Sequence, residues 1–355
     1  MYKVIEFSNE NEYINDFIGL AHTLYSQKEI MQNDAELKQL LTNTHILSKY
    51  FTLRKFIVYK NNIPVSRAIL TFYENDENAY FGFFETENDI AAVQALMQEL
   101  QKVAKQHNKA KIIGPVNASF WIGYRLKTNN FDEQPYLGEP YNKEYYYDLL
   151  KQVDFIDYEK YCTNFYNKPT KKYQNNKTSK RYQTFKRKDY EIKTLKDMKN
   201  KAEVNNILYD MMIDLYKNFP MFKWISKDDY IKYIGNNYKI CAYKMQKMVY
   251  YKGEPVAFCV TFPNYNNLFL QNSLKAKLQI LKRKFKSKQY IVTYMGVKRA
   301  HSGLGLAMVN EVIEDIKAKN AYPVGALIKK GKATAKYINE EIIKQNEYVL
   351  LYKNI

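Results

Sequence analysis

The sequence predicts an α+β protein built from two domains. Its 355 residues exceed what one hydrophobic core usually holds, since domains commonly contain about 100 to 200 residues. Strand-like and helix-like segments alternate in both halves, so each half can bury a core of its own. A polar and basic stretch separates the two halves. We therefore expect domains at residues 1–166 and 191–355, joined by a basic linker at residues 167–190.

The first half has the pattern of an antiparallel meander with two helices. The pair Asn61-Asn62 favours a tight turn between two strands. Residues 86–89 have the pattern of a capping box, and the apolar residues after them recur at helical spacing. The expected strands are residues 3–7, 55–59, 65–73, 79–84 and 111–114; one helix spans 13–24, and the other contains Val93, Leu96, Met97, Leu100, Val103 and Ala104.

The stretch between Lys168 and Lys188 contains hardly any aliphatic residue. Such a composition is typical of a solvated linker, and we expect a linker at this position. A segment that binds an anion is the alternative. Its basic residues are Lys171, Lys172, Lys177, Lys180, Arg181, Lys186 and Arg187.

The second half repeats the alternation and ends in a β-α-β-α-β pattern. The expected helices are residues 205–219, 227–234, 303–319 and 334–344, and the expected strands are 241–251, 256–262, 290–297, 323–328 and 348–352. A basic insertion lies between two of these strands. Its residues Leu274, Leu278 and Leu281 predict an amphipathic helix with a solvated charged face, and docking on a membrane or on RNA is the alternative.

Composition limits the kind of partner and the compartment. The net charge of +18 favours polyanions such as nucleic acid, an anionic membrane surface or a phosphate-bearing small molecule. No apolar run is long enough for a membrane span, and the start lacks a signal-peptide core, so we expect a cytoplasmic protein. Cys162, Cys241 and Cys259 are far apart and no metal-ligand spacing occurs, so we expect buried free thiols and no metal site.

The most informative segment is the passage from the strand at 291–297 into the helix that begins near Gly303. A helix start leaves about four amides unpaired and carries a partial positive charge, which suits a pyrophosphate. At Gly303 and Gly305 no Cβ obstructs the approach of phosphate oxygens. We expect the helix to bury the face formed by Leu306, Val309, Val312, Ile313 and Ile316.

The glycine pair by itself does not identify a ligand, because a tight turn without a ligand also accounts for an isolated Gly-x-Gly. The dinucleotide fingerprint is excluded because Met308 stands where its third small residue belongs. The segment 325–333 is one residue too long for a P-loop and ends in Ala333. No Gly-x-Ser-x-Gly nucleophile elbow is present.

The segment Ala300-His301-Ser302-Gly303-Leu304-Gly305 resembles the cofactor loop of the GNAT N-acyltransferase superfamily, Gln/Arg-x-x-Gly-x-Gly/Ala. It departs from that pattern at Ala300, where the adjacent Arg299 is a substitute. Most of the chain is similar to a bacterial group of uncharacterised tandem GNAT-like proteins. The matching stretches are residues 80–85, 114–115, 140–146 with Phe155, 253–258, 262–266 and the cofactor loop.

The resemblance implies two GNAT-like domains, each with a mixed, mostly antiparallel sheet flanked by helices. It also implies acetyl-CoA or another acyl-CoA as cofactor, and Tyr337 as a general acid on the helix after the fifth strand; alternatively, Tyr337 packs in the core. His301 either contacts phosphate or is a solvated loop histidine. The implied cofactor-binding residues are Tyr294, Met295, Gly296, Val297, Arg299, Ala300, His301, Ser302, Gly303, Leu304, Gly305 and Leu306.

The expected activity is transfer of an acetyl or other acyl group to a primary amine on a small molecule, protein or peptide. An aminoacyl-tRNA-dependent transferase of the Fem type is an alternative, because it would use the basic charge for tRNA. A non-catalytic binding protein is the third. We expect only the C-terminal domain to bind CoA, because the first half has Glu85, Glu87 and Asp89 where the loop would be.

Overall fold

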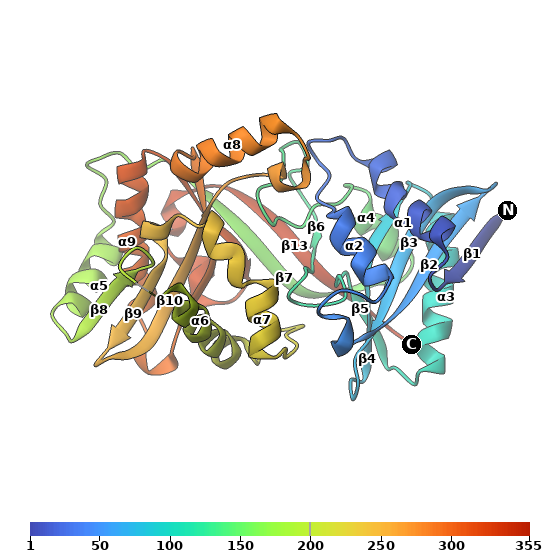
Figure 1. Cartoon of the computed structure of the whole chain (residues 1–355), viewed down its shortest axis with the longest axis horizontal. Coiled ribbons are helices and arrows are strands. Elements are labelled where there is room, and N and C mark those ends of the chain that lie inside the picture. The colour runs from blue at the N-terminus through green and yellow to red at the C-terminus, as the bar shows by residue number, and fades with distance from the viewer. Residues whose placement is uncertain (199) are drawn as a thin grey trace. The chain divides into compact units, whose positions relative to one another are not determined.

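The computed structural model describes residues 1–198 and 200–355. The chain forms two compact units: unit 1 consists of Met1–Lys160 and Glu347–Ile355, and unit 2 consists of Tyr161–Asn346. Each unit combines a β-sheet with helices, as the α+β prediction requires (Figure 1). The units differ from the expected domains because the last strand, β13 (Ile342–Asn354), runs from unit 2 into unit 1.

Unit 1 is built on a mixed sheet with the strand order β1-β2-β3-β4-β5-β13. The first four strands are antiparallel, β4 and β5 are parallel, and β13 pairs antiparallel with β5. The elements of unit 1 are β1 (Tyr2–Phe7), α1 (Asn11–Leu24), α2 (Asp34–Leu41), β2 (Thr52–Lys60), β3 (Ile63–Phe72), β4 (Asn78–Thr86), α3 (Ile90–Gln106), β5 (Lys111–Gly114), β6 (Leu126–Lys127) and α4 (Tyr146–Gln152).

Helix α3 confirms the periodicity of the first half, because all six apolar residues expected to face the core are buried. The helix packs on the sheet in one cluster with Phe56, Leu70 and Phe81. A second cluster joins α1 and α2 to the sheet through Phe17, Leu40 and Ile57. Helices therefore flank the sheet of unit 1, as expected.

Unit 2 has the strand order β7-β12-β11-β10-β9-β8, in which β11 and β12 are parallel and their neighbours antiparallel. Its elements are β7 (Ile156–Tyr166), which begins in unit 1, α5 (Asn176–Lys186), β8 (Tyr190–Thr194), α6 (Lys201–Tyr216), α7 (Lys227–Tyr233), β9 (Lys247–Tyr251), β10 (Glu254–Pro263), α8 (Leu274–Phe285), β11 (Gln289–Val297), α9 (Leu304–Lys319) and β12 (Tyr322–Lys329).

The core of unit 2 lies under α9. Leu304, Met308, Val312 and Ile316 pack there against strand residues that include Val249. Of the face expected from the sequence, Val312, Ile313 and Ile316 are buried, whereas Leu306 and Val309 are only half-buried. The buried face also includes Leu304, Ala307 and Met308.

Two expected features of unit 2 are wrong. The basic stretch expected as a linker contains helix α5, whose first turn is capped by the side chain of Asn175. The helix expected at residues 334–344 does not form: two short 3-10 turns, Ala333–Lys336 and Asn339–Glu341, lead directly into β13. Ile338 between them has a left-handed backbone, φ 47°, which interrupts any helix.

The three cysteines are buried and free, as expected. Within the described residues, no helix combines the length and the apolar character that crossing a membrane requires.

Candidate functional site

Strands β11 and β12 run parallel for a short distance and then part. Their pairing extends from Gln289 and Tyr322 to Val292 and Gly325. Thr293 is an extra residue in β11, because Val260 of β10 pairs with Tyr294 while the next residue, Thr261, pairs with Val292. Such a bulge bends a strand and changes the direction of the residues after it. Along residues 294–297, β11 stays paired with β10, and in the described part of the chain no pairing with β12 is found there.

The residues of this strand end differ in exposure. Tyr294 is 39% exposed, and Met295 and Val297 are half-buried. Gly296 is buried, and a Cβ atom added there would lie 2.6 Å from both Leu215 and Phe258. The absence of a side chain at Gly296 therefore lets α6 and β10 pack closely on β11.

The loop after β11 is short and tied to the sheet. The Lys298 amide donates to the Val256 carbonyl, 2.9 Å, and a 3-10 turn at Arg299–His301 comes next. Gly303 then adopts a left-handed conformation, φ 92°, and α9 begins at Leu304. A side chain with a Cβ is strained at such a φ, so glycine is required here by the backbone itself.

The start of α9 has no side-chain cap among the described residues. In the described chain, helices α1 and α4 also lack such a cap, whereas Asn, Asp or Ser side chains cap α2, α3, α5, α6, α7 and α8. The first amides of α9 thus keep their unsatisfied hydrogen-bonding capacity and the positive end of the helix dipole. Moreover, the sequence contains no Asp or Glu between residues 255 and 310. This helix start fits a phosphate or pyrophosphate.

A cation lies beside this helix start. A Cβ atom added to Gly303 would lie 3.4 Å from Cζ and Nε of Arg181, so the guanidinium lies against the glycine. Arg181 is on α5, which packs along α9. The hydroxyls of Thr178 and Ser179 contact the Asn310 Oδ1 of α9 at 3.3 and 3.1 Å and hold the two helices together. The amides and the guanidinium form one positively polarised corner whose chemistry suits an anion, and we call it the anion-binding corner.

The sequence interpretation preferred a linker at residues 167–190 and named Arg181 only among the basic residues of the anion-binding alternative, without placing it on a helix. Asn175, an N-cap residue before a charged helix-length stretch, was the available signal. The buried residues of α5 are Thr178 and Phe185. Two buried positions are too few for the spacing of apolar residues in the sequence to indicate a helix.

His301 has a structural partner. Its Nδ1 lies 2.8 Å from the Tyr190 hydroxyl, and its ring lies 5.2 Å from the ring of Tyr251. These contacts hold the loop against β8 and β9. His301 is therefore half-buried and not the solvated histidine of one sequence interpretation, while Arg299, Ala300 and Ser302 are exposed.

Tyr337 comes after the first 3-10 turn rather than lying on a helix. A Cβ atom added to Gly305 would lie 2.6 Å from its hydroxyl oxygen, so Tyr337 covers the first turn of α9. Burial raises the pKa of Tyr337 above its usual value, and the hydroxyl stays a proton donor at neutral pH. Gly305 thus makes room for Tyr337, whereas the sequence interpretation had reserved this space for a phosphate.

The corresponding place in unit 1 is closed. The pairing of β4 with β5 ends at Tyr80 and Ile113, and the Val116 amide then donates to the Phe81 carbonyl, 2.6 Å. A Cβ atom added to Gly82 would lie 1.9 Å from the Val116 carbonyl oxygen. The chain itself therefore packs against β4 beyond the end of the β4–β5 pairing.

The acidic residues of unit 1 have separate roles. Asp89 caps α3 by accepting from the amides of Ala91 and Ala92, 3.1 and 3.3 Å. Glu85 points inward, where it accepts from Tyr25 and Tyr146 at 2.8 and 2.7 Å, and burial raises the pKa of Glu85. Only Asp89 of the three expected carboxylates therefore satisfies the amides of the helix start.

Comparisons with known proteins find similarity in structure only. No family model and no curated protein matches this sequence. A tandem GNAT protein from the clavulanic acid biosynthesis pathway superposes with TM-score 0.56 and 7% identity over 100% of this chain and 98% of that chain. A probable N-acyltransferase from Enterococcus faecalis V583, described as a conserved protein of unknown function, gives TM-score 0.52 and 8% identity over 100% and 73%.

A third similar structure is a GCN5-related glucosamine N-acetyltransferase region of a fungal multi-domain GH3 β-N-acetylglucosaminidase. It gives TM-score 0.56 and 8% identity over 99% of this chain and 38% of that chain. These similarities extend over both units. The chain therefore has the fold of the tandem GNAT proteins.

Proposed function

We propose that this protein is an N-acyltransferase that moves an acetyl or another acyl group from acyl-CoA to a primary amine. The observation that carries the proposal is the anion-binding corner of unit 2, formed by the uncapped start of α9, the left-handed Gly303 and Arg181. It lies at the end of the short loop that follows β11. The fold is shared with acetyltransferases and supports the same conclusion.

Different residues of this region fit the pyrophosphate and the pantetheine arm of acyl-CoA. The amides at the start of α9 and the guanidinium of Arg181 would bind the pyrophosphate. The main chain of β11 beyond Val292, where its pairing with β12 ends, would bind the amides of the pantetheine arm as an added strand would. Acyl-CoA, when bound, supplies an activated thioester. The protein contributes orientation, since an amine held in line with the thioester reacts as if within one molecule.

The proposed activity is tested by titration with acetyl-CoA and by release of free thiol in the presence of primary amines. A small-molecule polyamine, an amino acid and a peptide N-terminus cover the main acceptor classes. We expect acetyl-CoA to bind and at least one amine to raise thiol release above hydrolysis. If acetyl-CoA does not bind but tRNA binds in a salt-sensitive way, the aminoacyl-tRNA alternative replaces the proposal.

Replacement of Arg181 by glutamine is expected to raise the Kd for CoA about tenfold, because a charge-assisted contact with phosphate is lost while α5 keeps its length. Arg187→Gln is the matched control: it removes the same charge near the C-terminal end of α5. Titration calorimetry distinguishes the two. Equal affinities for both variants would mean that Arg181 does not contact the ligand.

Tyr337→Phe tests two roles for the hydroxyl. The thiol of CoA lies at the opposite end of the pantetheine arm from the pyrophosphate, so a hydroxyl over the first turn of α9 is better placed to donate to phosphate than to the leaving thiolate. We expect the KM for acetyl-CoA to rise about three- to tenfold, because one hydrogen bond to the cofactor is lost, and we expect kcat to stay nearly unchanged. A lower kcat at unchanged KM would instead support the general-acid role.

A further inference from the structure

Helix α8 carries an apolar stripe that no other part of the described chain covers. Leu274, Leu278, Leu281 and Phe285 are 74%, 61%, 56% and 68% exposed. At about 100° per residue, their spacing of four, three and four places all four within about 60° of the helix circumference. Isolated exposed leucines are ordinary, but a contiguous stripe of this kind marks an interaction surface.

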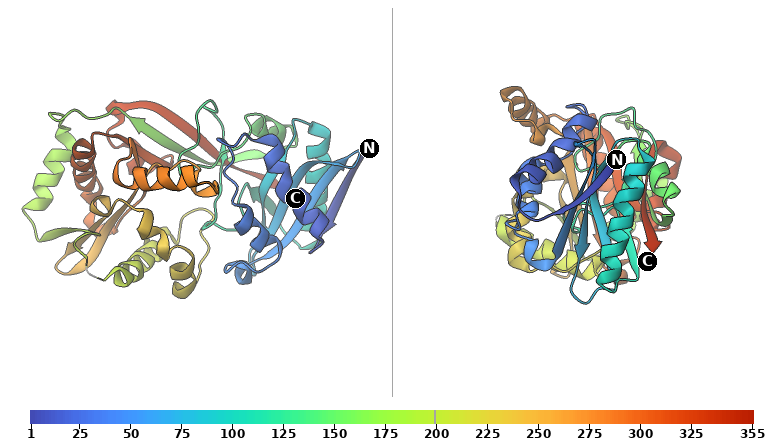
Figure 2. Two further views of the ribbon diagram at one scale, coloured as in Figure 1. Left: turned by 45° about the horizontal axis from the view of Figure 1, so that its top comes forward. Right: turned by 90° about the vertical axis from the view of Figure 1, so that its right-hand side faces the viewer.

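The opposite face of α8 fixes the helix to unit 2. Ala276 is buried, and the guanidinium of Arg283 donates to the Asn264 carbonyl at 3.0 Å. The Ser273 side chain caps the helix by accepting from the Ala276 amide, 3.1 Å. The helix lies on the outside of unit 2 (Figure 2). These contacts fix α8 to unit 2 through its opposite face, so the apolar stripe points toward solvent and does not belong to the core of unit 2.

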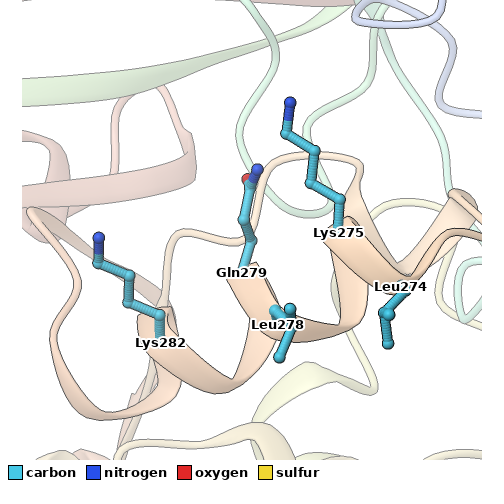
Figure 3. Close-up of a pocket in the computed structure, with 5 residues that line it drawn as sticks. All are labelled: Leu274, Lys275, Leu278, Gln279 and Lys282. Carbon is cyan, nitrogen blue, oxygen red and sulfur yellow. The ribbon is translucent and has the colours of Figure 1, made fainter.

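The charges around the stripe all have one sign. Lys275 and Lys282 lie along one edge of the stripe at helical spacing, and Lys277 and Lys284 lie along the other. Figure 3 shows Leu274 and Leu278 pointing to one side of the helix and Lys275, Gln279 and Lys282 to another. No acidic residue occurs in this segment, and its basic residues are Lys275, Lys277, Lys282, Arg283, Lys284, Lys286 and Lys288.

We propose that α8 docks this protein on an anionic lipid surface. The stripe would enter the boundary between headgroups and acyl chains, while the flanking lysines lay their stems along it and keep their ammonium groups at the lipid phosphates. An anionic lipid surface is the partner that matches both the apolar stripe and the lysines beside it. RNA would use the lysines but leave Leu274, Leu278, Leu281 and Phe285 in water, and a purely apolar partner would leave the lysines unpaired.

Vesicle co-sedimentation of the full chain tests the proposal. We expect binding to phosphatidylcholine vesicles that contain about 30 mol% phosphatidylglycerol, and weaker binding without the anionic lipid or at about 0.5 M salt. Leu278→Ser with Leu281→Ser should lower the partition coefficient about 30-fold, because two side chains no longer enter the apolar layer. Lys277→Gln with Lys284→Gln should lower it about tenfold.

Ile63→Ser is the matched control, because Ile63 is 62% exposed and lies outside unit 2. It should bind vesicles like the wild type, and unchanged melting temperatures should show that all variants fold. The proposal is overturned if the wild type stays in the supernatant or if the double leucine variant binds vesicles as tightly as the wild type. Binding of tRNA that requires the lysines but not the leucines, without vesicle binding, would assign α8 to nucleic acid instead.

Discussion

Replacement of Gly303 by valine is expected to abolish the stabilisation of this protein by acetyl-CoA. For the wild type, saturating acetyl-CoA should raise Tm by about 5 °C or more, as binding to the native state alone requires. Gly303 has φ 92°, which a β-branched residue adopts only with strain. Relief of that strain would re-orient the first amides of α9, and the new side chain would displace Arg181. The Kd for CoA should rise at least about 100-fold.

A matched variant separates loss of the site from loss of stability. Gly138 has φ 78° in unit 1, and a Cβ atom added there meets no atom within 4 Å. Gly138→Val therefore imposes similar backbone strain in unit 1, outside the unit that contains α9, and should retain the full thermal shift. The milder Gly303→Ala covers the case in which the valine variant does not fold. Full CoA affinity in a folded Gly303 variant would show that the start of α9 is not the pyrophosphate site.

A calorimetric titration of the full chain is expected to give one CoA per chain, bound by unit 2. In unit 1 the chain after β5 hydrogen-bonds to β4 at Phe81, and Gly82 is packed against Val116. No cofactor arm can enter there without breaking those contacts. Asp89 already satisfies two amides of α3, and its carboxylate would repel a phosphate at the same helix start.

The full chain is the appropriate material for this titration. A fragment that ends near Phe165 lacks β13, whose residues Leu351–Asn354 pair with β5 in unit 1. Such a fragment would expose a sheet edge and test folding more than binding. Asp89→Asn gives a sharper test, since removing the carboxylate from α3 should still not create a second site. Two bound CoA molecules per chain would contradict the assignment of the cofactor to unit 2.

Local patterns predicted most of the elements. The alternation in residues 55–84, with Asn61-Asn62 as a turn, corresponds to β2, β3 and β4, and both asparagines have positive φ as such a turn requires. The strand, loop and helix at 290–319 correspond to β11 and α9, with Gly303 at the junction. These features depend on neighbours in sequence, namely the side-chain period, turn residues and glycine, so the sequence shows them directly.

The errors have a common cause. Residues 334–344 have apolar residues at helical spacing, yet Glu340 is bound to Asn175 and Lys177 of α5 at 3.0 and 3.5 Å, and the chain then enters β13. Likewise, α5 has too few apolar residues to be recognised as a helix, and it is held by Asn310 of α9. In both places contacts with distant residues decide the local conformation, and intrinsic propensity is too weak to oppose them.

The sequence by itself determined the two-domain α+β architecture, the strand that leads into the glycine loop, and the positive charge around it. Only the tertiary structure decided that Arg181 lies against Gly303, that Tyr337 covers Gly305, and that the chain closes the corresponding place in unit 1. The physical reason is the separation in sequence between the residues that interact. A left-handed glycine or an uncapped helix start is a property of consecutive residues, whereas a site that joins α5, α9 and the segment before β13 requires residues more than 100 positions apart to pack together.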